Sequence, residues 1–225
     1  MSESVAIVAG ATGLVGSALV EQLAADRTWR EVRALVRHTP PEMSGRMVVP
    51  VSVDYSRLDP PPAWAAADHV FCALGTTMRR AGSAAEFRRV DFEFPVALAR
   101  ATLLRGARHF LLVSAVGAAP DSRVFYNRVK GEVEQAIAAL GFRAVTIARP
   151  SLLLGRRREP RLGEQLGKVV GLLAPPRWRP VRADHVARAL LEAARRDEPG
   201  VRILENRELR DAGRRSASAE PAGRH

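Results

Sequence analysis

Residues 5–16 read VAIVAGATGLVG, and this stretch decides the fold class of the 225-residue chain. The apolar run 5–9 has the length and composition of a strand buried on both faces. From Leu14 to Ala25, apolar residues recur at helical spacing. Glycines stand at the junction between the two segments. The stretch therefore predicts a buried strand that passes directly into a helix.

Strand-like and helix-like segments alternate along the rest of the first 150 residues. Pro50 cannot donate a hydrogen bond to a neighbouring strand, so the strand that contains it is expected at a sheet edge. The alternation predicts an α/β fold, a doubly wound and mostly parallel sheet with right-handed connections, in which ligands bind beyond the carboxyl ends of the strands. Further strands are expected at residues 32–36, 48–53, 69–74, 110–114 and 144–148, and further helices at 86–104 and 122–140.

We expect one dinucleotide-binding domain over residues 1–205. From about residue 150 the alternation fades, and this tract should form a small C-terminal substrate-side region rather than a separate core. Within it, helices are expected near 163–174 and 183–195, and a short strand at 201–204. Residues 206–225 contain few apolar side chains and are expected to be a disordered tail.

The composition of the chain indicates which kinds of partner, such as nucleic acids or metal ions, it is expected to lack. The chain carries 35 Lys and Arg against 24 Asp and Glu, a net charge of +11. Only Lys130 and Lys168 are lysines, and the arginines are scattered, which favours a solvated basic surface over a dedicated nucleic-acid site. One cysteine, Cys72, rules out an intrachain disulfide and a cysteine-pair metal site. We expect no metal, no membrane partner, a cytoplasmic location, and a monomer or homodimer.

The first strand–helix junction has the glycine spacing of a dinucleotide-binding turn. Gly10 permits the tight turn, Gly13 lets backbone amides approach a pyrophosphate, and Gly16 lets the helix pack closely on the strand. The helix N-terminus adds free N–H groups and a positive dipole end. A tight turn that holds nothing is the alternative. The cofactor-binding residues predicted here are Gly10, Thr12, Gly13, Leu14, Val15 and Gly16.

Three later strand ends bear on the same cofactor. Arg37 stands where a carboxylate would select NAD, and it can instead bind a 2′-phosphate, which favours NADP(H) over NAD(H); a solvated arginine is the alternative. Asp54 could accept from the adenine amino group or simply form a turn. Leu74 and Gly75 end the fourth strand, where a glycine lets the chain pass under the nicotinamide half or forms a plain turn.

Tyr126 and Lys130 carry the sharpest chemical signal. Residues four apart share a helix face, so the Lys130 ammonium would favour the phenolate of Tyr126 and make it a usable proton donor and acceptor. An ordinary packing pair is the alternative. Ser114 ends the fifth strand at the same sheet edge, and its hydroxyl could hold a substrate carbonyl oxygen beside Tyr126. A serine that only ends a strand explains Ser114 equally well.

Together these motifs resemble the short-chain dehydrogenase/reductase superfamily, whose sheet is of the Rossmann type. The glycine spacing resembles its atypical and extended branches. The resemblance implies NADP(H) or NAD bound across the sheet, with Tyr126 as the acid/base, Lys130 bonding the nicotinamide ribose, and the backbone around Pro150 lining the nicotinamide. Four stretches, 74–77, 89–91, 126–134 and 149–154, are similar to the oxidoreductase group typified by the human Tat-interacting protein.

Two positions depart from the superfamily pattern. Ala115 follows Ser114 where many relatives have paired serines, and Asp91 stands where ordinary members place an asparagine. The sequence predicts an NAD(P)H-dependent oxidoreductase that moves a hydride to or from a carbonyl or alcohol carbon of a small-molecule substrate. An NADP(H)-binding regulatory or redox-sensing protein with little turnover is the main alternative. Isomerisation of a nucleotide sugar is a third, which the short carboxyl region disfavours.

Overall fold

The computed structural model describes residues 4–37, 47–155 and 175–217. The helix expected near residues 163–174 lies outside the described residues. The larger strands are β1 (Ser4–Ala9), β2 (Trp29–Val36), β3 (Val48–Ser52), β4 (His69–Cys72), β5 (His109–Val113), β6 (Ala144–Arg149) and β9 (Gly200–Glu205). The α-helices are α1 (Leu14–Ala24), α2 (Met78–Ala81), α3 (Ala84–Arg88), α4 (Phe94–Leu104), α5 (Phe125–Ala138), α7 (Ala183–Arg196) and α8 (Asn206–Ala217).

All seven large strands join one sheet in the order β3-β2-β1-β4-β5-β6-β9, and every neighbouring pair is parallel. The predicted doubly wound parallel sheet is confirmed. β3 lies at an edge, as Pro50 requires, with Pro50 opposite Ala34 of β2. The strand order reverses direction between β1 and β4, which is where ligands bind in sheets of this type.

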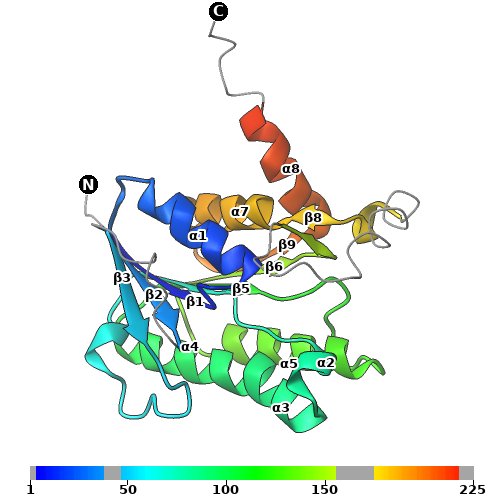
Figure 1. Cartoon of the computed structure of the whole chain (residues 1–225), viewed down its shortest axis with the longest axis horizontal. Coiled ribbons are helices and arrows are strands. Elements are labelled where there is room, and N and C mark those ends of the chain that lie inside the picture. Colours follow the sequence, from blue (N-terminus) through cyan, green and yellow to red (C-terminus); the bar gives the residue numbers. More distant parts are fainter. Residues whose placement is uncertain (1–3, 38–46, 156–174, 218–225) are drawn as a thin grey trace, which may run out of the picture.

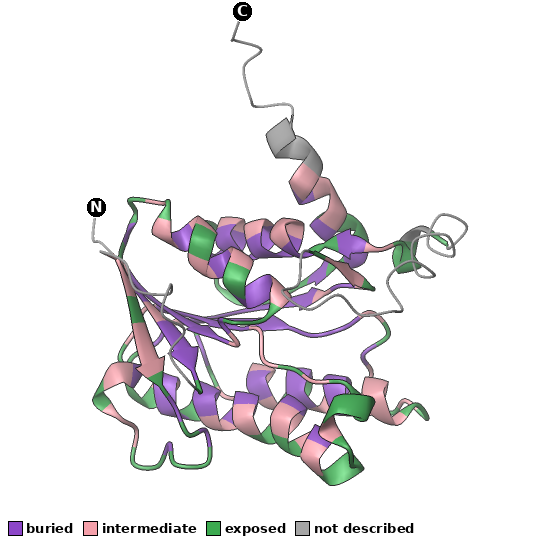
Figure 2. Cartoon of the chain, viewed as in Figure 1, coloured by how far each residue is buried: buried purple, intermediate pink, exposed green. Residues whose placement is uncertain are grey.

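Helices cover both faces of the sheet, and the apolar core therefore has two halves (Figure 1). On one face, α1 and α7 bury leucines such as Leu19 and Leu190 against the sheet. On the other, α4 and α5 bury Leu98 and Ile137. The sheet is mostly buried, whereas the outer sides of the helices are intermediate or exposed (Figure 2). Both layers leave the carboxyl ends of the strands free to carry loops.

The helix expected at 86–104 is divided into three parts. α3 ends at Arg88, a π-helical turn spans Arg89–Glu93, and α4 continues from Phe94. Pro95 has no N–H with which to close an α-helical bond to the carbonyl of Asp91, so the backbone widens there. The widened turn contains Asp91, a buried side chain.

The carboxyl-terminal region differs from the expectation at one point. Residues 206–217 form α8 instead of a disordered tail, because Leu209 and Ala212 are buried in the core cluster that also includes α7. This spacing gives an otherwise polar, arginine-rich helix one apolar face. The rest of the predicted tail, 218–225, lies outside the described residues. A small parallel two-stranded sheet forms between β7 (Leu153–Leu154) and β8 (Val181–Arg182). It joins the segment after β6 to the residues directly before α7. Within the described part of the chain, no helix is long and apolar enough to cross a membrane.

Candidate functional site

The glycine turn after β1 is packed as tightly as the spacing predicts. Gly10 has φ +76°, and a Cβ there would lie 2.5 Å from the carbonyl oxygen of Ala73, after β4. A Cβ on Gly16 would lie 2.0 Å from the carbonyl oxygen of Gly10. α1 begins at Leu14 with Gly13 as its N-cap and no side chain that caps it. The N–H groups of its first turn therefore lack a side-chain cap, and they lie after β1, where the strand order reverses between β1 and β4.

The ends of β2 and β3 carry the two residues predicted to meet the adenosine half of a cofactor, Arg37 and Asp54. Arg37 is exposed and forms no salt bridge with another described residue. Asp54 is exposed too, but it accepts hydrogen bonds from the Ser56 N–H at 3.0 Å and the Ser56 hydroxyl at 2.6 Å. These bonds hold the pKa of Asp54 below its ordinary value. The geometry is that of the turn-forming aspartate.

Tyr55 lies beside Asp54 and was not singled out from the sequence. Its ring stacks on Phe94 with a centroid distance of 5.4 Å, and its hydroxyl is buried without a hydrogen-bond partner in the described structure. Burial raises the pKa of this phenol, so it remains a neutral donor. The backbone N–H of Gly10 lies near this oxygen and offsets part of the rise in pKa. A buried hydroxyl without a full partner is a position where a ligand or an ordered water binds. An aromatic residue three positions after the third strand was the available signal.

α5 carries Tyr126 and Lys130 one turn apart. The Tyr126 ring packs against Phe87 at a centroid distance of 5.5 Å, and its phenol is partly exposed. Lys130 is buried, and its Nζ lies 2.8 Å from Oδ1 of Asp91. Burial by itself would lower the pKa of Lys130, but the charges of Asp91 and the nearby Tyr126 raise it above its usual value. Lys130 therefore stays protonated within reach of the Tyr126 phenol.

Ser114 follows β5 at the same edge of the sheet. Its N–H donates to the carbonyl of Ala148 at 2.8 Å, while its Oγ is buried and has no hydrogen-bond partner among the described residues. The loop continues to Val116, whose N–H donates to the carbonyl of Pro150 at 2.9 Å. The exits of β5 and β6 are thus tied together, and a free hydroxyl lies between them.

Leu74 and Gly75 follow β4 directly, between the glycine turn and Lys130. Gly75 is exposed, and a Cβ added to it would lie 3.4 Å from Asp91 Oδ1 and 3.7 Å from Lys130 Nζ. The predicted residues from Gly10 to Pro150 therefore gather at the carboxyl edge of the sheet. Arg37 and Asp54 lie at its β2–β3 end, and Tyr126, Lys130 and Ser114 lie around β4 to β6.

Two supporting residues were missed from the sequence. The Asn206 side chain, at the start of α8, accepts from the Ser151 N–H at 3.0 Å and donates to the carbonyl of Arg179 at 2.8 Å. It joins the segment after β6 to the segment before β8. Gly131 of α5 packs against the loop after β5, because a Cβ there would lie 2.2 Å from the carbonyl carbon of Ala119. Only its unusual place within a helix could have signalled this.

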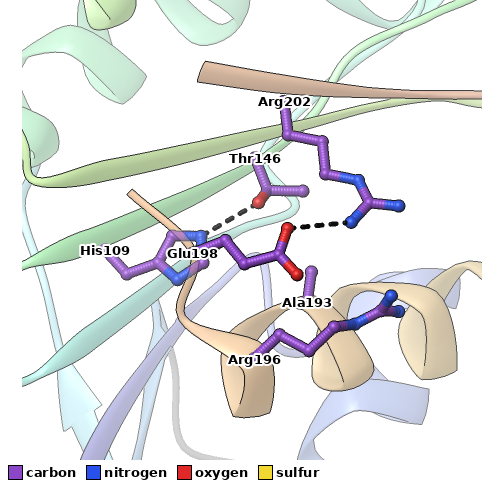
Figure 3. A pocket seen from close by; sticks show the side chains of 6 residues that line it. All are labelled: His109, Thr146, Ala193, Arg196, Glu198 and Arg202. Carbon is purple, nitrogen blue, oxygen red and sulfur yellow. Dashed lines mark hydrogen bonds and ion pairs between the residues drawn. The ribbon is translucent and has the colours of Figure 1, made fainter. Parts of the chain in front are cut away.

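A small pocket at the opposite edge of the sheet offers less chemistry (Figure 3). Four of its polar side chains already form pairs: His109 Nε2 lies 2.9 Å from Thr146 Oγ1, and Arg202 contacts Glu198 at 3.3 Å. The pocket is lined by His109, Thr146, Ala193, Arg196, Glu198 and Arg202. We therefore place the functional site at the carboxyl edge.

Next to this pocket, His69, His109 and Asp197 bring three possible ligand atoms within 4.8 Å of one another. However, Arg108 and Arg143 also contact Asp197, at 2.9 and 2.8 Å. A divalent cation would lie beside two guanidinium groups, and their repulsion argues against a metal there.

Comparison with known proteins decides the family. Residues 10–197 match the family model described as NAD(P)H-binding. The chain belongs to this NAD(P)H-binding family. The matched range contains the glycine turn, Tyr126, Lys130 and the whole of α7. Of the site residues described above, Asn206 lies beyond it.

Members of the family from fungi and mammals align along nearly the whole chain. Protein FMP52, mitochondrial, from Eremothecium gossypii is 35% identical over 213 residues, which cover 91% of this chain and 95% of that protein. Protein HTATIP2 from Rattus norvegicus is 33% identical over 223 residues, which cover 96% and 92%. The predicted membership of the atypical short-chain dehydrogenase/reductases, near the Tat-interacting-protein group, is confirmed.

Solved structures confirm the Rossmann-type fold. MoeE5 in complex with UDP-glucose and NAD superposes with a TM-score of 0.69 at 18% identity, covering 90% of this chain and 75% of that one. A putative epimerase from Burkholderia cenocepacia gives a TM-score of 0.66 at 20% identity, covering 94% and 82%. At these identities the similarity concerns the fold alone.

The relatives also correct one prediction. The sequence predicted a cytoplasmic location, but the FMP52 proteins of Eremothecium gossypii, Coccidioides immitis and Candida albicans are named as mitochondrial. The single cysteine and the overall composition were therefore not a sound basis for predicting a location.

Proposed function

We propose that this chain is an NADP(H)-dependent oxidoreductase that interconverts a carbonyl and an alcohol on a small-molecule substrate, with Tyr126 as the acid/base. One observation carries the proposal: the open N-terminus of α1 and the Tyr126–Lys130 pair lie at the same carboxyl edge of one parallel sheet. This arrangement brings a phosphate-binding turn and a proton-transfer group to one crevice.

The residues fit a nicotinamide dinucleotide. The uncapped first turn of α1 offers N–H groups to a diphosphate, and Gly10 and Gly16 leave room for the chain to turn there. Arg37 is exposed without a carboxylate partner in the described structure and can bind the 2′-phosphate that distinguishes NADP(H). The buried hydroxyl of Ser114 lacks a partner that a bound ligand would supply.

The protein side of the reaction is a proton exchange at oxygen. When bound, the nicotinamide supplies or accepts the hydride. Tyr126 gives its phenolic proton to the substrate oxygen in reduction and takes it back in oxidation. Lys130, charged one helical turn away, stabilises the phenolate that forms between these events. Ser114 donates a hydrogen bond to the same substrate oxygen and fixes its position.

The test separates binding from turnover. In a thermal-shift assay, NADPH at a hundredfold excess over Kd should raise Tm by about 5–10 °C, in wild type and in Tyr126→Phe. A screen of aldehydes and ketones with NADPH should give turnover that falls at least 100-fold in Tyr126→Phe. Unchanged turnover in this variant would refute the role of Tyr126. Binding without turnover on any carbonyl would favour the regulatory alternative.

A further inference from the structure

Asp91 forms a buried ion pair with Lys130, at the position where ordinary members of the superfamily place an asparagine. Asp91 and Lys130 are 1% and 4% exposed, and Asp91 Oδ1 lies 2.8 Å from Lys130 Nζ. The other carboxylate oxygen, Oδ2, accepts a hydrogen bond from the Thr76 N–H at 2.8 Å. One side chain thus contacts both the helix of the acid/base and the loop after β4.

We propose that Asp91 is a positioning residue that holds the Lys130 ammonium charged and in place and, through Thr76, fixes the loop after β4 against it. The inference rests on the proposed function, in which Lys130 serves Tyr126. Asp91 itself is buried beside Gly75 and Lys130, so it acts through Lys130 and the loop after β4.

The charge balance around Lys130 supports this assignment. Among the described residues, three ionisable groups influence the charge on its ammonium: Asp91 from the π-helical turn, Tyr126 from its own helix and Cys72 from β4. Burial raises the pKa of Cys72 to about 12, so this thiol is neutral and supplies no counter-charge. Asp91 is the carboxylate that pairs with Lys130 within the described part of the chain. Without it, burial would drive Lys130 towards its neutral form.

The backbone at Asp91 places the carboxylate where it is needed. The π-helical turn Arg89–Glu93 widens the helix directly before α4, and such single turns are frequent at functional sites. A continuous α-helix would rotate Asp91 relative to α4. Pro95 causes the widening, and it therefore helps the π-helical turn to direct Asp91 towards α5.

The composition of the chain allows a direct test. The protein has two lysines, Lys130 and Lys168, so 13C-lysine labelling gives two sets of side-chain signals, which Lys168→Arg assigns. In the cofactor-free wild type, the Lys130 signal should show no titration up to about pH 10.5, the ordinary value for lysine. In Asp91→Asn the midpoint should fall by about one pH unit or more.

Several outcomes would overturn the inference. A Lys130 midpoint below that of an ordinary lysine in wild type refutes it without any variant. The same Lys130 curve in Asp91→Asn as in wild type would leave Asp91 with a merely structural role. If Asp91→Asn does not fold, Asp91→Glu provides the comparison, since a retained carboxylate should keep Lys130 charged. Loss of the charged form in Asp91→Glu would contradict the proposal.

A second measurement isolates the contact with Thr76. Asn at position 91 keeps an oxygen that can accept from the Thr76 N–H, whereas Ala removes it. NADPH affinity by titration should therefore fall further in Asp91→Ala than in Asp91→Asn. Equal NADPH affinities in the two variants would contradict the proposed role of Asp91 in fixing the loop after β4. Because the lysine titration needs neither cofactor nor substrate, its failure is distinguishable from failure of the proposed oxidoreductase function.

Discussion

Glu134 on α5 and Arg149 at the end of β6 form a two-bond ion pair, with Nε to Oε1 at 3.1 Å and Nη2 to Oε2 at 2.5 Å. Arg149 also reaches Glu205 of β9 at 3.3 Å. The pair fixes the distance between the helix that carries Tyr126 and the strand that leads into Pro150. This one side-chain contact therefore holds two elements of the candidate site together, α5 and the end of β6.

The two carboxylates on Arg149 give a matched comparison of stability. The Glu134 side chain is 7% exposed, whereas that of Glu205 is 53% exposed. Glu134→Gln should lower the free energy of unfolding by about 2 kcal/mol, because it leaves a partly buried guanidinium without its main partner. Glu205→Gln should cost less than about 1 kcal/mol. Urea denaturation at pH 7 measures both, and equal losses would contradict the difference in burial.

Arg37→Ala tests the choice of cofactor. Loss of charge-assisted bonds to the 2′-phosphate should weaken NADPH binding about 10- to 100-fold and leave NADH binding nearly unchanged. Arg30→Ala, an exposed arginine at the other end of the same strand, is the control and should change neither affinity. Fluorescence titration with both cofactors gives the ratio. Parallel losses for NADPH and NADH would remove Arg37 from the phosphate site.

Gly131→Ala should destabilise the protein although it lies inside a helix. Alanine normally stabilises a helix interior by about 1 kcal/mol relative to glycine. Here the added Cβ would lie 2.2 Å from the backbone of Ala119, so the loop after β5 must move. We expect a net loss of about 1–3 kcal/mol in thermal or urea unfolding. A gain in stability would show that the loop gives way freely.

The buried imidazole of His69 should make stability fall in acid. Burial, reinforced by the charge of Arg108, lowers the pKa of His69 to about 4, and neither ring nitrogen has a hydrogen-bond partner in the described structure. The unfolded chain takes up this proton near pH 6.5, whereas the folded protein resists it. Stability is therefore complete above about pH 6.5 and decreases as the pH falls towards about 4, by about 3 kcal/mol.

His69→Leu tests this pH dependence. The variant removes the titrating group, so the difference in unfolding free energy between pH 7 and pH 4.5 should become smaller than in wild type. Urea denaturation at the two pH values supplies the comparison, and the pH 7 measurement corrects for any change in packing against Trp29, whose ring lies 5.0 Å away. An unchanged pH difference would assign the acid sensitivity to other groups, such as His109.

Several features of this fold could be predicted from local sequence patterns. Apolar periodicity predicted the order of strands and helices, and the glycine spacing predicted the tight turn at Gly10. The four-residue interval predicted that Tyr126 and Lys130 share one face of α5. These features depend on neighbours within one or two turns of chain, so the sequence shows them directly.

Tertiary structure alone decided which distant groups meet. Asp91 lies many residues from Lys130 and Thr76, and Asn206 lies far from Ser151, so no spacing rule could pair them. α8 also forms against expectation. Its two buried side chains, Leu209 and Ala212, are enough to hold the helix in place because α7 provides an apolar surface for them. Contacts of this kind depend on how strands are ordered across the sheet, and local periodicity carries no information about that order.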